Sequence, residues 1–209
     1  MSLDASKRKK DKGKKTKQKL LDTASELFAN NDFDAVSVDR IVEAAGIAKG
    51  TFYIYFDTKD ALIATLISDY VNNVDADYKA HLDSLPVGTS ASDKLLSLVA
   101  KIADVLEGTI GYHRMRMVYR IQLTGVLDTD SVKGYNRKLY RLFADLLYSG
   151  VNQGAFTANL PVEATTKHFV MAMRGISFEW CIRSPDYNLK EQAVSHFKLL
   201  LNGICDTNK

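Results

Sequence analysis

The stretch from Val36 to Lys59, VSVDRIVEAAGIAKGTFYIYFDTK, constrains the fold more than any other part of the chain. Ser37 is placed to N-cap a short helix whose apolar residues recur every three or four positions. Gly46 would end that helix, because a turn this tight favours a residue that accepts positive φ. A second short helix follows, with Phe52 and Phe56 four residues apart on its inner side. The pattern therefore predicts two short helices joined by a tight glycine turn.

This layout is typical of a helix-turn-helix, which lays its second helix in the major groove of DNA. The outward positions of that second helix supply a cation, two hydroxyls and a bare backbone, a mixture suited to phosphate contacts. They are Lys49, Gly50, Thr51, Tyr53 and Ile54. The alternative is a pair of amphipathic helices in an ordinary helical core, since many helical hairpins satisfy the same pattern.

The segment AGIAKGTFYIYFDTKDAL resembles the TetR family of transcriptional regulators. The family pattern is small-Gly-apolar-Ser-Lys-Gly-Thr-apolar-Tyr-x-Tyr-Phe, then x-x-Lys-x-x-Leu. Upstream, KLLDTASELFANNDFDAVSVDRIVEAAG resembles the family's first two helices, so the likeness covers roughly residues 16–66. Two positions depart from the pattern. Ala48 stands where the family usually has a Ser that caps the recognition helix, and Asp39 stands where Arg is common.

The resemblance implies a homodimeric DNA-binding regulator, a repressor that a small, mostly apolar ligand releases from a palindromic operator. It places Thr51, Tyr53 and Lys59 at phosphates, with Lys49 and Ile54 nearest the base edges. A cation in the first turn of a helix opposes the helix dipole, so the position of Lys59 also favours a phosphate nearby. The residues expected at DNA are Ser37, Arg40, Lys49, Gly50, Thr51, Tyr53, Ile54 and Lys59.

The N-terminal segment carries a dense positive charge. Residues 7–19, KRKKDKGKKTKQK, hold nine Lys or Arg and one acid, which leaves 19 basic and 24 acidic residues in the rest of the chain. Such a run buries no apolar surface, so residues 1–15 are expected to form a disordered basic arm until an anion binds. Its place beside the helix-turn-helix favours an arm that follows DNA. The alternative is a solvated tail that aids solubility.

Composition predicts an all-α protein. Of 209 residues, 46% are hydrophobic, which suffices for a core, and only 3 are Pro and 12 Gly. The expected order is a helix-turn-helix DNA-binding domain at 16–60 and a helical regulatory and dimerisation domain at 61–209. The first helix is expected to begin near Thr16. Asp57 or Thr58 caps a long fourth helix that reaches about Leu82 and joins the two regions.

The sequence gives no support for a membrane segment or for catalysis. No apolar run approaches the length of a membrane span, and no apolar h-region follows the basic N-terminus. Cys181 and Cys205 are too few for a disulfide framework, so a reducing cytoplasm is the expected location. The four histidines lack an i, i+4 partner, and no Gly-x-Ser-x-Gly or phosphate-binding glycine loop occurs. We expect no enzyme activity, no metal and no cofactor, with an all-helical enzyme as the remote alternative.

The C-terminal region is rich in methionine and aromatic residues. At helical spacing such residues belong to a core more often than to a ligand site. Resemblance to the TetR family nevertheless implies a largely apolar ligand cavity among these helices, with few polar groups. The residues expected to line it are Tyr112, Met115, Tyr119, Gln122, Phe143, Phe169, Met173 and Arg174.

Two helices expected at 132–152 and 161–183 carry more apolar surface than one core-facing stripe needs. A second apolar face on a helix indicates another surface packed against it. In TetR-like proteins the corresponding pair forms a four-helix dimer interface. The expected partners are therefore double-stranded DNA, a second copy of this chain and an unidentified small molecule. The residues expected at the interface are Tyr140, Tyr148, Val170, Phe178 and Cys181.

Two functions of different classes are left open. The first is the ligand-responsive DNA-binding regulator described above. The second is a small-molecule-binding helical protein whose helix-turn-helix is structural and binds no specific DNA, a reading that Ala48 and Asp39 support. Selection from a random duplex pool separates the two, because a dimeric regulator should enrich a palindrome.

Overall fold

The computed structural model describes residues 2–125, 130–134 and 137–205, and within these ranges the chain forms helices and turns but no strand. The all-α fold expected from the sequence is confirmed. The N-terminal elements are α1 (Ser2–Asn30), η1 (Phe33–Ala35), α2 (Val38–Ala45), α3 (Lys49–Tyr55) and α4 (Lys59–Asp83). The others are α5 (Ala91–Asp104), η2 (Val105–Ile110), α6 (Tyr112–Thr124), α7 (Asp130–Lys133), α8 (Lys138–Asn152), α9 (Val162–Arg183) and α10 (Leu189–Asn202).

The helix-turn-helix forms as its capping residues predict. The Ser37 hydroxyl accepts a hydrogen bond of 3.1 Å from the backbone N–H of Arg40, which satisfies one free donor at the start of α2. Gly46 ends α2 with φ of 60°, in the left-handed region that favours glycine. Thr58 caps α4 through a 3.1 Å bond from the N–H of Ala61. The turn between α2 and α3 is therefore fixed by local chemistry.

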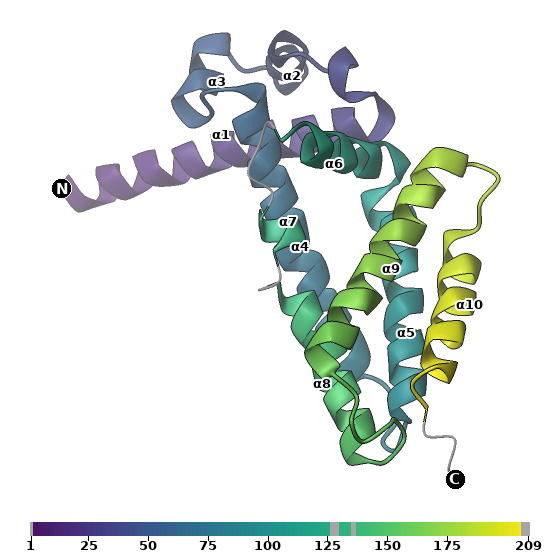
Figure 1. Ribbon diagram of the computed structural model, residues 1–209. Coiled ribbons are helices and arrows are strands. Elements are labelled where there is room, and N and C mark those ends of the chain that lie inside the picture. The colour runs from purple at the N-terminus through teal and green to yellow at the C-terminus, as the bar shows by residue number, and fades with distance from the viewer. Residues whose placement is uncertain (1, 126–129, 135–136, 206–209) are drawn as a thin grey trace.

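The molecule has two hydrophobic cores that share two helices. The smaller core lies under α2 and α3 and takes Leu62 to Ile67 of α4 together with Met117 and Ile121 of α6. The larger core includes Val74 and Tyr78 farther along α4 and the buried apolar residues of α5, α8, α9 and α10. In Figure 1, α4 runs from the α2–α3 unit down to the lower helices, which is how one helix serves both cores. The domain boundary expected between residues 60 and 61 falls within the first turn of α4.

Two expected boundaries are corrected. The helix expected at 132–152 is divided into α7 and α8, because Gly134 follows α7 directly and a residue without a side chain weakens a helix interior. The first helix begins at Ser2 instead of near Thr16, so the segment expected to be disordered is helical. The basic run contains no Pro and one Gly, and Lys and Arg are good helix formers, so nothing local ends the helix there.

Candidate nucleic-acid interface and adjoining cavity

The outer face of α3 is exposed where the sequence predicts contact with DNA. Phe52 is fully buried and anchors the helix, while the side chains of Tyr53 and Ile54 are 48% and 75% exposed. Lys49 and Gly50 are exposed as well, and Thr51 is half-buried. The structure therefore brings these five predicted residues onto one short helix that projects from the molecule (Figure 1).

Asp39 of α2 has a partner that the sequence did not suggest. Its carboxylate lies 2.6 Å from the Lys49 ammonium, and both side chains are more than half exposed. The hydrogen bond that the Lys49 ammonium donates to this carboxylate raises the pKa of Lys49 above its ordinary value. An ion pair so exposed contributes little to stability. Its consequence is electrostatic, because Asp39 offsets part of the positive charge that Lys49 brings to the outer face of α3.

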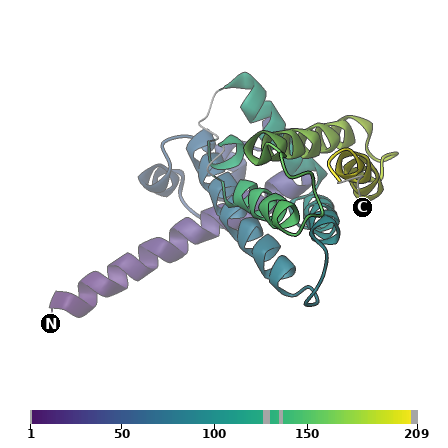
Figure 2. The same cartoon turned by 60° about the horizontal axis from the view of Figure 1, so that its bottom comes forward.

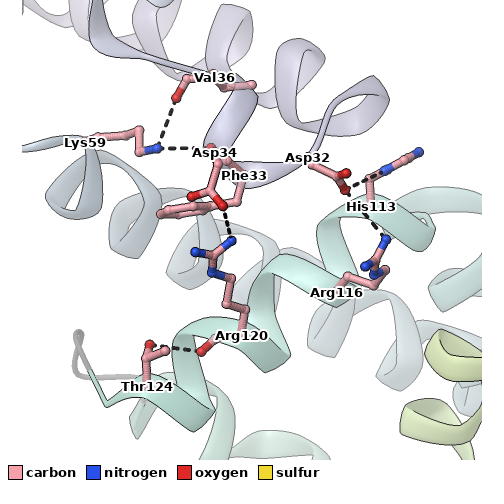
Figure 3. A network of polar contacts seen from close by, with 9 residues as sticks. All are labelled: Asp32, Phe33, Asp34, Val36, Lys59, His113, Arg116, Arg120 and Thr124. Carbon is pink, nitrogen blue, oxygen red and sulfur yellow. Dashed lines mark hydrogen bonds and ion pairs between the residues drawn. The ribbon is translucent and has the colours of Figure 1, made fainter.

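Lys59, for which a phosphate contact is expected, lies apart from the outer face of α3 and is bonded within the protein. Its ammonium donates to the carbonyl oxygens of Phe33 at 3.0 Å and Val36 at 3.1 Å, and lies 3.8 Å from the centre of the Phe33 ring (Figure 3). Burial lowers the pKa of this amine. Carbonyl oxygens and an aromatic face thus stabilise the cation that opposes the α4 dipole. Lys59 fixes the loop between α1 and α2.

Ser37 and Arg40 also act within the loop between α1 and α2. The Ser37 hydroxyl is the cap of α2. The Arg40 guanidinium donates to the carbonyl of Ala35 and to the side-chain oxygen of Asn31, each at 3.1 Å. Ser37 and Arg40 both remain at the surface, but neither belongs to the outer face of α3. Any contact they make with DNA would come from the side of α2.

Charged residues of α6 contact the same loop from the other side. Arg120 pairs with Asp34 at 2.5 Å, and Asp32 lies 3.6 Å from both His113 and Arg116 (Figure 3). These pairs join α6 to a segment that precedes the helix-turn-helix, across more than eighty residues of sequence. The sequence alone did not indicate these pairs. The only local signal was a helix in which arginines alternate with apolar residues.

A second link between α6 and the N-terminal unit is partly buried. The Arg114 guanidinium donates to the Ser25 carbonyl at 2.9 Å and to the Ser25 hydroxyl at 3.1 Å, and its other amino group donates to the carbonyl of Ile110 at 3.0 Å. Tyr70 of α4 lies 2.6 Å from the same Ser25 hydroxyl. Helices α1, α4 and α6 therefore meet at Ser25.

An apolar cavity lies beside this junction. It encloses about 130 Å³ of free space, far more than the roughly 10–15 Å³ that a single water needs. Its wall combines α1 and α4 with α6, α8 and α9, so both cores contribute to it. Six of the eight predicted residues line it: Met115, Tyr119, Gln122, Phe143, Met173 and Arg174.

Two predicted pocket residues lie elsewhere, and several lining residues were not predicted. Phe169 packs between Phe143 and Phe197 in the larger core, and Tyr112 packs edge-on against Trp180. Both are ordinary core contacts, which helical spacing does not distinguish from ligand contacts. The missed residues come mainly from α1 and α4 and include Ser25, Phe28, Tyr70, Val74 and Tyr78.

Three arginines supply most of the charge in the cavity wall. Arg137 is neutralised by Asp75, which is 2% exposed and accepts bonds of 2.7 to 3.1 Å from its guanidinium. Arg114 and Arg174 donate instead to backbone carbonyls, which carry no net charge. No Asp or Glu occurs among the described residues that line the cavity. The wall is therefore apolar with an excess of positive charge.

The residues expected at a dimer interface divide into two groups. Tyr140, Val170 and Cys181 are buried in the larger core of their own chain, which corrects their expected role. Burial raises the pKa of the Cys181 thiol to about 11. Tyr148 and Phe178 are 45% and 40% exposed. Two further exposed apolar residues, Met171 and Ile182, lie on the same side of α9 as Phe178 and were not expected at the interface.

The described residues contain no group of three or more His, Cys, Asp or Glu side chains that could hold a metal ion. None of the described helices combines the length and apolar character needed to cross a membrane.

Comparison with known proteins identifies the helix-turn-helix. Residues 20–66 match the model of the family described as bacterial regulatory proteins, tetR family. The transcriptional repressor KstR2 of Mycolicibacterium smegmatis is 24% identical over 191 residues, which cover 90% of each chain. The structure of FadR from Bacillus subtilis in complex with stearoyl-CoA has a TM-score of 0.72 at 21% identity and covers 90% of this chain and 98% of that chain.

Another solved structure has the same fold. A transcriptional regulator from Saccharomonospora viridis in complex with choline has a TM-score of 0.74 at 15% identity and covers 92% of this chain and 99% of that chain. The matches extend from the helix-turn-helix over nearly the whole length of the protein. The helix-turn-helix region of this chain, residues 20–66, therefore belongs to the tetR family of bacterial regulatory proteins.

Proposed function

We propose that the protein is a dimeric repressor whose α3 enters the major groove of a palindromic operator, and that a ligand in the cavity lowers its affinity for DNA. The observation that carries the proposal is the exposed row on α3, from Lys49 to Ile54, held outward by the buried Phe52. A cation, hydroxyls and an exposed aliphatic side chain suit phosphates and base edges. The similarity to repressors such as KstR2 supports the assignment.

Selection from a random duplex pool tests the DNA-binding part of the proposal. The full-length protein should enrich a palindrome whose half-sites lie about one helical turn apart, or a multiple of it. A matched variant, Phe52→Ala, removes the buried anchor of α3 and should abolish enrichment while the larger core stays folded. The alternative is a helix-turn-helix that is only structural, which the Asp39–Lys49 ion pair would support. In that case no sequence should be enriched.

For the ligand, we propose an amphipathic anion with an extended apolar part. The cavity wall is apolar, and Arg114 and Arg174 leave it with positive charge that no lining carboxylate offsets. In a site of low dielectric such charge attracts an anion and repels a cation. Among the ligands found in structures of this fold, stearoyl-CoA fits this description and choline does not. The proposed class is therefore an acyl thioester or a similar acyl anion.

Release of operator DNA distinguishes these chemistries. Stearoyl-CoA should lower the affinity of the protein for a fluorescent operator duplex, whereas choline should leave it unchanged. Free coenzyme A tests whether the apolar chain is needed, and the methyl ester of stearic acid tests whether the charge is needed. Release by choline, or equal potency of the neutral ester, would contradict an anionic ligand.

A further inference from the structure

The three arginines among the described residues of the cavity wall differ in how many of their hydrogen-bond donors are already used. A guanidinium carries five N–H donors. Arg114 makes five hydrogen bonds, three to Ser25 and two to carbonyls at the end of η2, so all its donors are used. Arg137 makes three hydrogen bonds to the carboxylate of the buried Asp75. Neither guanidinium can receive a ligand without losing a bond within the protein.

Arg174 differs from the other two because most of its donors are unused. It lies on α9, which runs beside α8 in both views of the molecule (Figures 1 and 2). Its guanidinium donates one hydrogen bond, of 3.1 Å, to the carbonyl of Val132 and lies 5.6 Å from the centre of the Tyr140 ring on α8. Four of its N–H donors therefore have no acceptor among the described residues. The side chain is half-buried in the cavity wall.

Gln122 of α6 is a second side chain of the wall whose polar groups are unused. It is half-buried, and its amide makes no hydrogen bond with the described residues. One turn earlier on α6, the Tyr119 hydroxyl donates to the backbone carbonyl of Arg174 at 2.9 Å. Residues three apart on a helix share a side, so Gln122 lies on the side of α6 that faces Arg174. A charged fork and an amide, both with unused donors, thus meet in an otherwise apolar wall.

We propose that Arg174 and Gln122 bind the oxyanion of the ligand and so fix its orientation in the cavity. The proposal rests on the proposed function, which places an amphipathic anion there. A guanidinium can donate two parallel hydrogen bonds to a carboxylate or a phosphate, and the Gln122 amide can donate a third. The oxyanion is therefore the carboxylate of an acid or a phosphate of its thioester conjugate. The apolar part of the ligand lies along the rest of the wall, which includes Phe28 and Ile67 of the smaller core.

Equilibrium dialysis of radiolabelled ligands against the full-length protein, without DNA, tests this assignment. The probes are stearate, stearoyl-CoA and the neutral methyl stearate. Arg174→Gln should weaken binding of an anionic probe by about 10- to 100-fold, because hydrogen bonds to a charged group are lost. The affinity for methyl stearate should stay unchanged. This neutral probe also reports on folding, since a variant with a collapsed cavity would lose all three ligands.

Two further variants separate the proposed site from the general charge and polarity of the wall. Arg114→Gln removes the same charge from the same wall, but from a guanidinium whose donors are already used, so the affinity should fall much less than in Arg174→Gln. Gln122→Leu makes the wall more apolar, which by itself would favour a ligand with an acyl chain. If the amide donates to the oxyanion, this variant should instead weaken the anionic probe by about 2- to 10-fold.

The outcomes decide between binding at Arg174 and attraction by net charge. Equal losses in Arg174→Gln and Arg114→Gln, unchanged affinity in Arg174→Gln, or a gain in Gln122→Leu would each overturn the proposal. A loss in Arg174→Gln that is confined to stearate or to stearoyl-CoA supports the site and identifies a carboxylate or a phosphate as its occupant. Because DNA is absent, failure of operator selection leaves this result intact. A parent protein that binds none of the probes would contradict both this site and the proposed class of ligand.

Discussion

Lys59 and Tyr53 are both expected at DNA phosphates, but the structure places their side chains in different surroundings. The Lys59 ammonium is bonded to two loop carbonyls, whereas Tyr53 is half exposed on α3. Lys59→Met should therefore lower the free energy of unfolding by about 1–3 kcal/mol, because it leaves two carbonyls without their charged donor. Tyr53→Phe should leave stability unchanged and weaken binding to all duplexes by about 1 kcal/mol.

Urea unfolding of both variants, combined with affinity measured on operator and random duplex, checks this distinction. If Lys59→Met unfolds like the parent protein yet loses affinity for every duplex, the amine contacts phosphate after all. The Tyr53 assignment would be abandoned if its affinity for both duplexes equals that of the parent protein.

The sequence could predict those residues whose role depends on near neighbours. Ser37 caps α2 through an N–H three residues away, and Gly46 supplies the positive φ of the turn that follows. The partners of Lys59 lie 23 and 26 residues earlier in the chain. Sequence could therefore show that this cation opposes its helix dipole, but not which groups stabilise it. Pairs of that kind depend on how the loop folds back.

Helix α6 connects the cavity to the DNA-binding unit. Its residue Arg114 lines the cavity and donates to the carbonyl and hydroxyl of Ser25 in α1. An anion in the cavity would compete with these two acceptors for the guanidinium. Loss of the bond would free α1, and with it the α2–α3 unit that packs on α1, to move relative to α6.

Arg114→Gln should therefore uncouple the ligand from DNA. Coupling between sites is typically about 1–3 kcal/mol, or 5- to 150-fold in affinity. In the parent protein stearoyl-CoA should change operator affinity by a factor in this range, and in the variant by a factor near one. Arg116→Gln is the matched control, because Arg116 lies on the same helix but contacts Asp32 outside the cavity. A variant that binds the ligand and still releases DNA to the same extent would exclude this route.

The cavity illustrates what helical periodicity can and cannot predict. The Met and aromatic residues of α6 and α9 stood out by composition, and six of eight predicted residues are in the wall. The α1 and α4 residues of the wall recur at the spacing of core residues, and most of them also belong to one of the two cores. Tyr140 and Val170 lie outside the core-facing stripe expected for their helices. The larger core nevertheless packs around α8 and α9 on enough sides to bury both side chains. Periodicity gives the direction of a side chain but not the number of helices around it.

In the part of the chain that the structure describes, one apolar surface on α9 is not covered by other residues. Met171, Gly175, Phe178 and Ile182 are exposed and follow one another at i, i+4, i+7 and i+11, which is one side of α9. Gly175 has no heavy atom within 4 Å of an added Cβ, so a partner helix can approach closely there. Tyr148 of α8 is exposed as well, and its hydroxyl donates to Glu163 at the start of α9.

A second copy of this chain is the expected cover, since a stable dimer buries on the order of 1,600 Å² or more in total, with a core-like centre. The double variant Phe178→Glu with Ile182→Glu places two charges in that centre, where burial without partners costs several kcal/mol. Sedimentation at micromolar concentration should show a dimer for the parent protein and a monomer for this variant. Leu199→Glu is the control, because Leu199 is 68% exposed on α10, outside the proposed surface, and its substitution should leave the dimer intact.

The monomeric variant should also lose most of its operator affinity, because a palindrome is bound tightly only when both half-sites are occupied together. A parent protein that sediments as a monomer, or a double variant that remains dimeric, would refute α9 as the dimer surface.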